Sequence, residues 1–368
     1  MIRSLLNKIL LLINLVCALA LLMSYASMYV SPAFSWFPAF LGLAYPYLLC
    51  VNIGFVCFWL VKIHANCLIS LFIILSGFGL IGRFIQIPFF KPDIKTASTQ
   101  AGISMISYNV RGLSFKNNKG KTVSPDTLYG IIAGSGCKII CFQEFPVSLT
   151  SSFETALSEK TEGKIYKHSV SADENIMGNG NATFSTYPVI GGGKIELATA
   201  SNLCIYTDLK IGRDTVRIYN CHLHSNRIIK DDLTFLENMG KEYNSKQINT
   251  LKEITSKLKT AYTLRSQQVD SIASHIRQSP YRVVVCGDFN DTPVSYTYRK
   301  MRRNMQDAFV KAGQWTSSTY QRGIYSFRID YIFCDSGMKF NQYRCAPYIL
   351  SDHYPVFCNF TILAQNSK

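Results

Sequence analysis

The chain has 368 residues, 48% of them hydrophobic, and a formal net charge of +15 at pH 7. This length allows one large domain and a smaller region beside it. A basic chain favours anionic partners such as nucleic acid, phospholipid headgroups or small phosphates. Lys and Arg are spread along the chain rather than gathered in a block, which argues against a dedicated nucleic-acid tail.

Three uncharged apolar runs lie near the start of the chain, at residues 9–23, 40–61 and 67–81. With modest extension, each reaches the roughly 20 residues that a bilayer-crossing helix needs. The first run alone would suit a signal peptide, but two further runs favour anchoring over cleavage. The sequence therefore predicts a region of about three transmembrane helices at residues 1–90.

The basic residues suggest which way this region crosses the membrane. Arg3 and Lys8 flank the first run, whereas the loop that follows it has no Lys or Arg. The N-terminus is therefore expected in the cytoplasm, and three crossings would place the larger domain outside. Lys91 and Lys95, on that outer side, argue the other way, as does the number of cysteines with no evident partner. We expect a multi-pass protein of the cell (inner) membrane whose larger domain is extracytoplasmic.

The twelve cysteines contain no Cys-x-x-Cys spacing, so neither a zinc ribbon nor a thioredoxin motif is present. Nothing in their spacing requires disulfide bonds. Several lie inside apolar, strand-like runs, where we expect buried thiols that act as small hydrophobic residues. These are Cys141, Cys221, Cys286, Cys334 and Cys358.

A polar stretch at residues 91–102 is predicted to be a linker, and a second domain is expected at residues 103–363. Short β-type runs alternate there with turn signals, and residues 127–136 and 233–279 carry helical patterns. Many of the β-type runs are apolar on both faces, as in strands covered on both sides. The expected fold is an α/β sandwich of two packed sheets with helices on the outer faces.

Polar side chains recur where these apolar runs end. A single carboxylate at such a position usually caps a loop, but it is costly to bury without compensation. Several at corresponding strand ends indicate groups that converge on one site. Oxygen ligands without a thiolate suit a hard cation, Mg²⁺ or Mn²⁺. The residues concerned are Asn109, Glu144, His222, Asp288, Asn290, Asp330, Asp352 and His353.

The motifs that carry these residues resemble those of the endonuclease/exonuclease/phosphatase superfamily. SYNVRG, CFQEF, VVVCGDFNDTP, RIDYIF and LSDHYPVF follow one another in the order that is typical of that superfamily. NGNATFSTYPVI and NCHLHS are similar to two further conserved segments of it. The resemblance covers residues 103–360 and implies a four-layer sandwich of the DNase I type, with two mixed β-sheets flanked by helices.

The same resemblance implies a metal site. Glu144 corresponds to the main ligand, and Asn109 and Asp352 complete or flank the site. The implied ion is Mg²⁺ or Mn²⁺, either one ion or two, and no organic cofactor is implied. Such an ion neutralises charge on the phosphate and helps the leaving oxygen to depart.

Five residues correspond to the superfamily's catalytic positions. Asp288 and Asn290 match the pair that positions the attacking water and orients the scissile phosphate. His353 pairs with Asp330, and His222 donates to a non-bridging oxygen. The sequence leaves open whether Asp288 or His353 takes the proton of the water, since these two groups titrate together.

Other polar residues are expected to be structural. His168, His224 and His275 are assigned to the surface or to hydrogen bonds within the fold. Arg265 is expected in a local ion pair, with a position facing the cleft as the alternative, and a contact of Arg328 with a substrate phosphate is considered but not favoured.

The expected function is a membrane-anchored, divalent-metal-dependent phosphoesterase that hydrolyses a phosphodiester, nuclease-like but with its substrate unassigned. Catalysis of this kind is positioning plus stabilisation of developing negative charge. The alternatives are a phospholipid or sphingomyelin phosphodiesterase and an inositol-phosphate-type phosphatase. The partners would be a nucleic acid, a phospholipid headgroup or a phosphorylated small molecule, and the membrane. A catalytically inactive binding module is a further alternative, which the complete residue set argues against.

Overall fold

The computed structural model describes residues 2–88, 102–114, 124–172, 178–197, 202–228, 231–232, 234–235, 245–322, 325–346 and 350–364. Nearly all of the predicted linker at residues 91–102 lies outside these ranges. The described chain forms two compact units, and each is described by itself. The first contains Met1–Gly82, Ser225–Gln267 and Asp291–Arg299, and the second contains Arg83–His224, Gln268–Asn290 and Lys300–Lys368.

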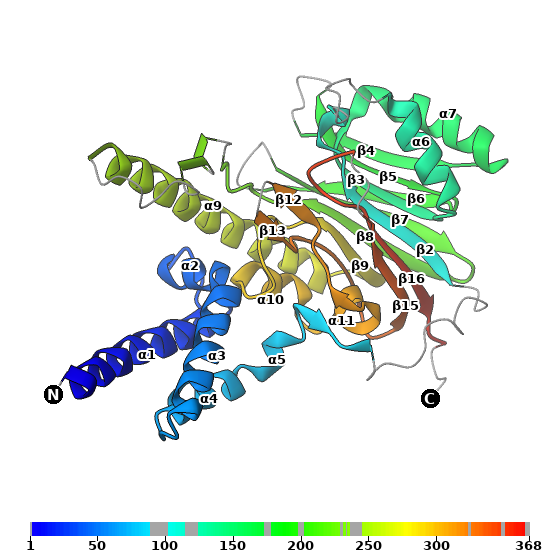
Figure 1. The fold of residues 1–368 in the computed structure, drawn as a ribbon. Coiled ribbons are helices and arrows are strands. Elements are labelled where there is room, and N and C mark those ends of the chain that lie inside the picture. Colours follow the sequence, from blue (N-terminus) through cyan, green and yellow to red (C-terminus); the bar gives the residue numbers. More distant parts are fainter. Residues whose placement is uncertain are drawn as a thin grey trace. The chain divides into compact units, whose positions relative to one another are not determined.

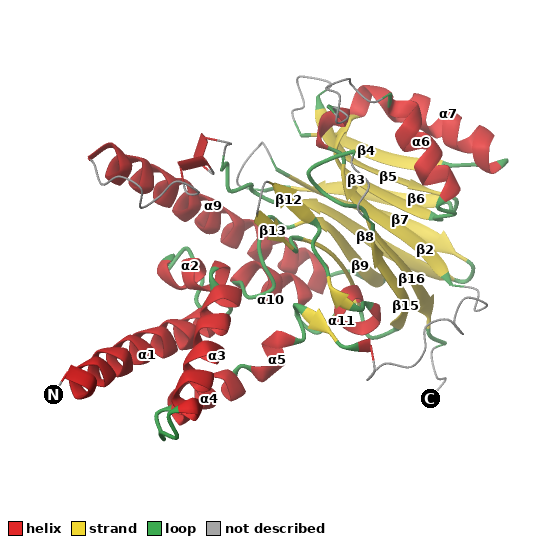
Figure 2. Cartoon of the chain, viewed as in Figure 1, coloured by secondary structure: helices red, strands yellow, loops and turns green. Residues whose placement is uncertain are grey.

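Two six-stranded sheets form the body of the second unit (Figures 1 and 2). One sheet has the strand order β10 (Gln306–Asp307), β14 (Asp330–Cys334), β9 (Arg282–Asp288), β8 (Asp214–His222), β7 (Leu203–Ile211) and β6 (Val189–Ile195). The other has the order β15 (Met338–Cys345), β16 (Val356–Ile362), β2 (Ile103–Asn109), β3 (Ile139–Pro146), β5 (Asn179–Ser185) and β4 (Tyr166–Ser171).

Both sheets are mixed. The pairs β8–β9 and β2–β3 are parallel, and the other neighbouring pairs are antiparallel. Inward-facing side chains of the two sheets pack into one hydrophobic core, which includes Met105 and Cys141 from one sheet and Val284 and Ile332 from the other. Each sheet therefore has one face against its partner, which explains why the strands lack a simple alternation of polar and apolar residues.

Helices cover the outer faces. Helices α6 (Pro125–Gly134) and α7 (Thr150–Thr161) pack on the sheet that contains β3, through a second hydrophobic core around Phe142 and Phe153. The C-terminal part of α9 (Ser245–Arg277) covers β8, where the Tyr219 hydroxyl lies 2.9 Å from His275 Nδ1. This arrangement confirms the predicted sandwich of two mixed sheets flanked by helices.

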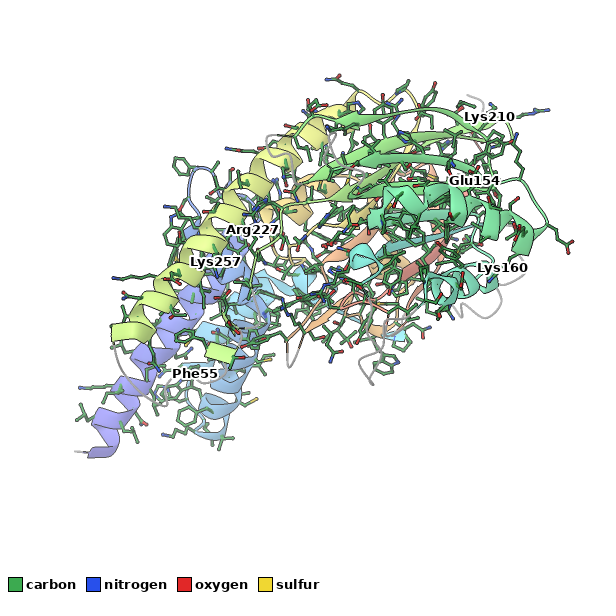
Figure 3. All side chains as sticks on the ribbon, turned by 90° about the horizontal axis from the view of Figure 1, so that it is seen from above. Phe55, Glu154, Lys160, Lys210, Arg227 and Lys257 are labelled. Carbon is green, nitrogen blue, oxygen red and sulfur yellow. The ribbon has the colours of Figure 1, made fainter. Side chains whose placement is uncertain are left out.

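Several charged side chains lie on the outer surface of the second unit (Figure 3). Lys160 on α7 and Lys210 on β7 are exposed, and Glu154 on α7 forms an ion pair with Lys167. The five cysteines expected in the core are all buried. All twelve cysteines belong to the described residues, and none forms a disulfide.

Shorter elements complete the second unit. Helix α11 (Ala308–Ala312) packs beside β14 and β15, and α10 (Tyr296–Arg302) begins in the first unit. Two small antiparallel pairs of strands also form. β1 (Ile85–Gln86) pairs with β11 (Trp315–Thr316), which is distant in the chain, and β12 (Tyr320–Arg322) pairs with β13 (Tyr325–Phe327), which follows it closely.

Five helices begin the first unit: α1 (Ile2–Ala26), α2 (Phe37–Leu43), α3 (Tyr45–Val61), α4 (Cys67–Ser76) and α5 (Phe78–Ile81). A buried polar network connects three of them. Asn14 Nδ2 donates to Ser70 Oγ at 2.6 Å, and Trp59 Nε1 donates to Asn14 Oδ1 at 3.0 Å. Ser70 Oγ in turn donates to Asn52 Oδ1 at 2.8 Å. Hydrogen bonding offsets the cost of burying these polar groups among apolar helices.

The sequence predicts about three membrane-crossing helices. The described residues contain fewer helices that are both long enough and apolar enough to cross a membrane. One helix, at Ser4–Ala26, is long and apolar enough to cross a membrane. A second span exists only if α2 and α3, which meet at a 69° bend, count together. The third predicted run is divided between α4, which has 10 residues, and the four-residue α5. The break falls at Gly77, where a Cβ atom would overlap the ring of Tyr25.

Candidate active site

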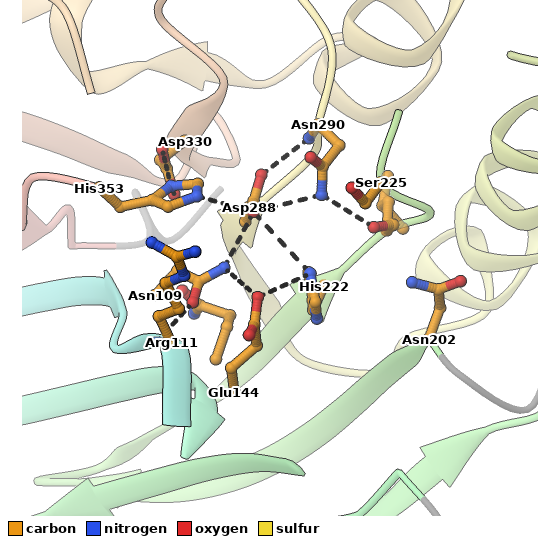
Figure 4. Close-up of polar contacts among 12 residues, drawn as sticks. Asn109, Arg111, Glu144, Asn202, His222, Ser225, Asp288, Asn290, Asp330 and His353 are labelled. Carbon is orange, nitrogen blue, oxygen red and sulfur yellow. Dashed lines mark hydrogen bonds and ion pairs between the residues drawn. The ribbon is translucent and has the colours of Figure 1, made fainter. Parts of the chain in front are cut away.

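The predicted polar residues meet at one end of the two sheets. In the strand register, Asp288 at the end of β9 lies opposite His222 of β8 and Asp330 of β14. Asn109 ends β2 in the other sheet and pairs with Gln143 of β3, the residue before Glu144. The parallel pairs β8–β9 and β2–β3 and the antiparallel pair β9–β14 therefore bring these side chains close together, as Figure 4 shows.

Asp288 is the centre of the cluster. It is 1% exposed and accepts hydrogen bonds from Asn109 Nδ2 at 3.0 Å and from the Asn290 backbone N–H at 2.8 Å. Asn290 Nδ2 adds a third, at 3.2 Å. The Nε2 atoms of His353 and His222 lie 3.5 Å and 3.9 Å from its Oδ2. Three donors and two imidazoles thus compensate a carboxylate that is almost fully buried.

Asn109 connects the two sheets. Its Nδ2 group donates to Glu144 Oε1 as well as to Asp288 Oδ2, both at 3.0 Å. Its Oδ1 accepts a hydrogen bond from the backbone N–H of Arg111 at 3.0 Å. The side chain therefore holds two carboxylates at fixed positions on either side of one amide.

Two of these residues have a left-handed backbone. Glu144 and Asn290 both have φ near +52°, which is uncommon for residues other than glycine. At Glu144 the pairing of β3 with β5 also shifts register, as in a β-bulge that redirects a side chain. The Glu144 carboxylate is 33% exposed and lies 3.6 Å from His222 Nε2. Such strained conformations persist when the surrounding structure requires them, and they gather at functional sites.

His353 and Asp330 form the predicted dyad. His353 Nδ1 lies 3.0 Å and 3.2 Å from the two carboxylate oxygens of Asp330, and both residues are buried. Burial opposes protonation of His353, but Asp330 and Asp288 outweigh it and raise its pKa to about 10. Burial raises the pKa of Asp330 to about 6, against the effect of His353. At neutral pH the dyad is therefore an imidazolium paired with a carboxylate.

Asp352 lies beside Arg111, whose Nη1 atom is 3.1 Å from Asp352 Oδ2. The Arg111 side chain is 53% exposed, and its backbone φ is +45°. Arg111 had no role in the sequence prediction, although it lies two residues after Asn109 in SYNVRG. The unusual backbone that turns it toward Asp352 leaves no signal in the sequence.

The segment before β12 is a second feature that the sequence did not reveal. Thr319 Oγ1 accepts the backbone N–H groups of Ile329 and Asp330, at 3.0 Å and 2.9 Å. The next residue, Tyr320, packs its ring on His353 with centroids 4.9 Å apart. This segment therefore supports both members of the dyad, and only the tertiary pairing of distant segments brings it there.

The residues assigned to structural roles make contacts that agree with that assignment. Arg328 is buried, and its Nη1 atom lies 2.9 Å from Asp307 Oδ2. Arg265 is fully buried, with Nε 3.5 Å from Asp291 Oδ2. The three histidines bond within the fold: His168 Nδ1 to Thr207 Oγ1 at 3.0 Å, His224 Nδ1 to Asn202 Oδ1 at 2.9 Å, and His275 to Tyr219.

The donor set fits a divalent cation. Four carboxylates, those of Glu144, Asp288, Asp330 and Asp352, gather here, and the described residues that ion-pair with them are one arginine and two histidines. Among the described residues, Asp288, Asp330 and His353 also form a buried group whose potential ligand atoms lie within 4.8 Å of one another. Clustered carboxylate oxygens of this kind suit Mg²⁺ or Mn²⁺.

Comparison with protein-family models identifies the class of protein. Residues 106–353 match the model of the Endonuclease/Exonuclease/phosphatase family. The chain therefore belongs to this family, as the resemblance of its motifs predicted. Members of the family act as phosphoesterases. Residues 7–84 match a second model, a domain of unknown function named DUF8431.

Solved structures support the fold assignment. A family protein from Leptotrichia buccalis is 15% identical, has a TM-score of 0.52, and matches over 71% of this chain and 100% of its own. A family protein from Bacteroides vulgatus is 16% identical, has a TM-score of 0.51, and matches over 72% of this chain and 100% of its own. At these identities the likeness concerns the fold alone. No curated protein matches the chain.

Proposed function

We propose that this protein is a divalent-metal-dependent phosphodiesterase. The observation that carries the proposal is the position of Asp288, a buried carboxylate that accepts three hydrogen bonds and faces the imidazoles of His222 and His353. A buried acid beside two histidines and a half-buried glutamate suits the hydrolysis of a phosphate ester, which depends on orienting a water molecule and stabilising negative charge.

Glu144, Asn109 and Asp352 are the residues that would hold Mg²⁺ or Mn²⁺. Glu144 carries the most accessible carboxylate of the cluster, and Asn109 ties it to Asp288. When bound, the ion supplies positive charge that neutralises the phosphate and stabilises the leaving oxygen.

The side chains around the ion would orient the water molecule, transfer its proton and bind the phosphate oxygens. Asn290 and Asp288 are joined by hydrogen bonds and orient the attacking water. The carboxylates of Asp330 and Asp288 raise the pKa of His353 and favour its protonated form, which would donate to the phosphate, while Asp288 would accept the proton of the water. His222 directs Nε2 toward Glu144 and Asp288 and donates to a non-bridging oxygen.

Hydrolysis of a simple phosphodiester tests this function. We expect the full-length protein in detergent, with Mg²⁺, to hydrolyse bis-p-nitrophenyl phosphate, and we expect EDTA to abolish the release of nitrophenol until Mg²⁺ is restored. Hydrolysis that continues unchanged in EDTA would contradict metal dependence. Parallel assays with plasmid DNA, sphingomyelin vesicles and inositol phosphates distinguish the nuclease-like activity from the two alternatives.

We further propose that the helical region anchors the protein in the cell membrane with the chain after Gly82 on the extracytoplasmic side. Lys62 Nζ donates to Asn7 Oδ1 at 2.7 Å, so the basic residues Lys8 and Lys62 lie at the same end of the helices. At the other end, the Tyr25 hydroxyl donates to the Ile73 carbonyl oxygen. Basic residues gathered at one end favour the cytoplasmic side for that end.

Reporter fusions test the orientation. Alkaline phosphatase fused after Lys368 should be active, and the same reporter fused after Lys62 should be inactive, since it requires an oxidising compartment to fold. Fluorescent-protein fusions at both positions serve as the matched controls and should show the opposite pattern. An inactive phosphatase with a bright fluorescent protein at Lys368 would place the larger domain in the cytoplasm.

A further inference from the structure

The first compact unit does not consist of the N-terminal helices alone. It also contains Ser225–Gln267 and Asp291–Arg299, which belong by sequence to the stretch matched by the Endonuclease/Exonuclease/phosphatase model. The second of these segments begins at the residue that follows Asn290. The chain that leaves the catalytic corner therefore runs directly into a unit built by the N-terminal helices.

The N-terminal helices hold the segment Asp291–Arg299 closely. Ser27 Oγ donates to the Val294 carbonyl oxygen at 2.9 Å. A Cβ atom on Gly42 would overlap the same carbonyl oxygen, so this position in α2 has room only for glycine. The Arg299 guanidinium lies over the ring of Tyr29, 4.4 Å from its centroid. A hydrogen bond and a close backbone approach thus act at Val294, and a cation–π contact acts at Arg299, near the end of the same segment.

Helix α9 completes this packing within the same unit. The rings of Phe40 and Tyr262 meet edge to face with centroids 5.4 Å apart, and Tyr262 is 2% exposed. Three residues further along α9, the fully buried Arg265 lies beside Asp291. The first residue after Asn290 is therefore held by the helix that the N-terminal region packs against.

We propose that the N-terminal helical region, which includes the DUF8431 domain, is a positioning element for the catalytic corner as well as a membrane anchor. Asn290 has φ near +52°, a conformation that requires support from its surroundings. The Asn290 backbone N–H and side-chain amide both donate to Asp288. Asp291, which is covalently bonded to Asn290, belongs to the segment that packs with these helices, so the backbone is restrained from the residue that follows Asn290 onward. The inference rests on the proposed phosphodiesterase function.

A pair of glycine substitutions tests the proposal in the full-length protein. Gly42→Ala places a methyl group against the Val294 carbonyl oxygen, whereas a Cβ on Gly54 of α3 has no atom within 4 Å. We expect Gly42→Ala to lower kcat by about 10- to 100-fold with little change in KM, because small misplacements of catalytic groups have effects of this size. Gly54→Ala should match the wild type.

A milder variant and a readout independent of activity complete the test. Ser27→Ala removes the hydroxyl that contacts the carbonyl oxygens of both Ser24 and Val294, adds no bulk, and should lower kcat by a smaller factor than Gly42→Ala does. Amide hydrogen exchange should be faster across residues 289–299 in Gly42→Ala than in Gly54→Ala. Hydrogen exchange can be measured even if the wild type hydrolyses no phosphodiester. That result would reject the proposed function but not the positioning role of the helices. Equal exchange and equal kcat in the variants and the wild type would overturn the positioning role.

Discussion

Replacing Asp288 with Asn is expected to lower kcat/KM for bis-p-nitrophenyl phosphate by about 10²- to 10⁴-fold, the usual effect of losing a positioned general base. The amide cannot accept the proton of the water. Its NH₂ group would also face the donors that Asn109 and Asn290 direct at the carboxylate. The measurement is steady-state kinetics on purified full-length protein in the presence of Mg²⁺.

Asp214→Asn is the matched control for this substitution. Asp214 begins β8, the strand that ends in His222, and 46% of its side chain is exposed. This variant should keep wild-type activity, and both variants should keep the circular dichroism spectrum of the wild type. Activity of Asp288→Asn within twofold of the wild type would remove Asp288 from the mechanism.

Glu144→Gln is expected to raise the Mg²⁺ concentration needed for half-maximal activity by about 10- to 100-fold, an effect typical of weakened metal coordination. The substitution keeps the size of the side chain and removes one negative charge from the cluster. A Mg²⁺ titration of activity measures the change, and Mn²⁺ binding followed by electron paramagnetic resonance measures it without turnover.

Glu154→Gln provides the control, since Glu154 lies on α7 and pairs with Lys167 at the surface. Asp330→Asn provides the contrast, because Asp330 belongs to the buried group with Asp288 and His353. If Asp330→Asn weakens Mn²⁺ binding while Glu144→Gln leaves it unchanged, the ion binds at the buried group and not beside Glu144.

The motifs of the chain predicted the sandwich correctly because they are local patterns, and the structure places the predicted site residues close together. Runs such as VVVCGD are apolar on both faces because each sheet lies between its partner and a layer of helices. A carboxylate at the end of such a run indicates a site, since burial without partners is costly. The structure brings Asp288 into contact with Asn109, Asn290, His222 and His353, as this reasoning implies.

The supporting residues were not predictable in the same way. Thr319 is an ordinary loop residue until the fold places its hydroxyl beside the backbone of Asp330. Arg111 depends on a left-handed backbone to reach Asp352. In the helical region, hydropathy located the third apolar run but not its break at Gly77, a residue that packs so closely on the ring of Tyr25 that a Cβ atom has no room there.

The sequence by itself determined the family, because motifs such as CFQEF, VVVCGDFNDTP and LSDHYPVF are short local patterns that resemble those of the Endonuclease/Exonuclease/phosphatase family, whose model matches residues 106–353. The tertiary structure alone decided which segments fold together. Asp291–Arg299 follows Asn290 in the chain and yet packs with helices that begin near residue 2. That partition depends on contacts such as Ser27 with Val294, between residues that are far apart in sequence, and no local pattern records them.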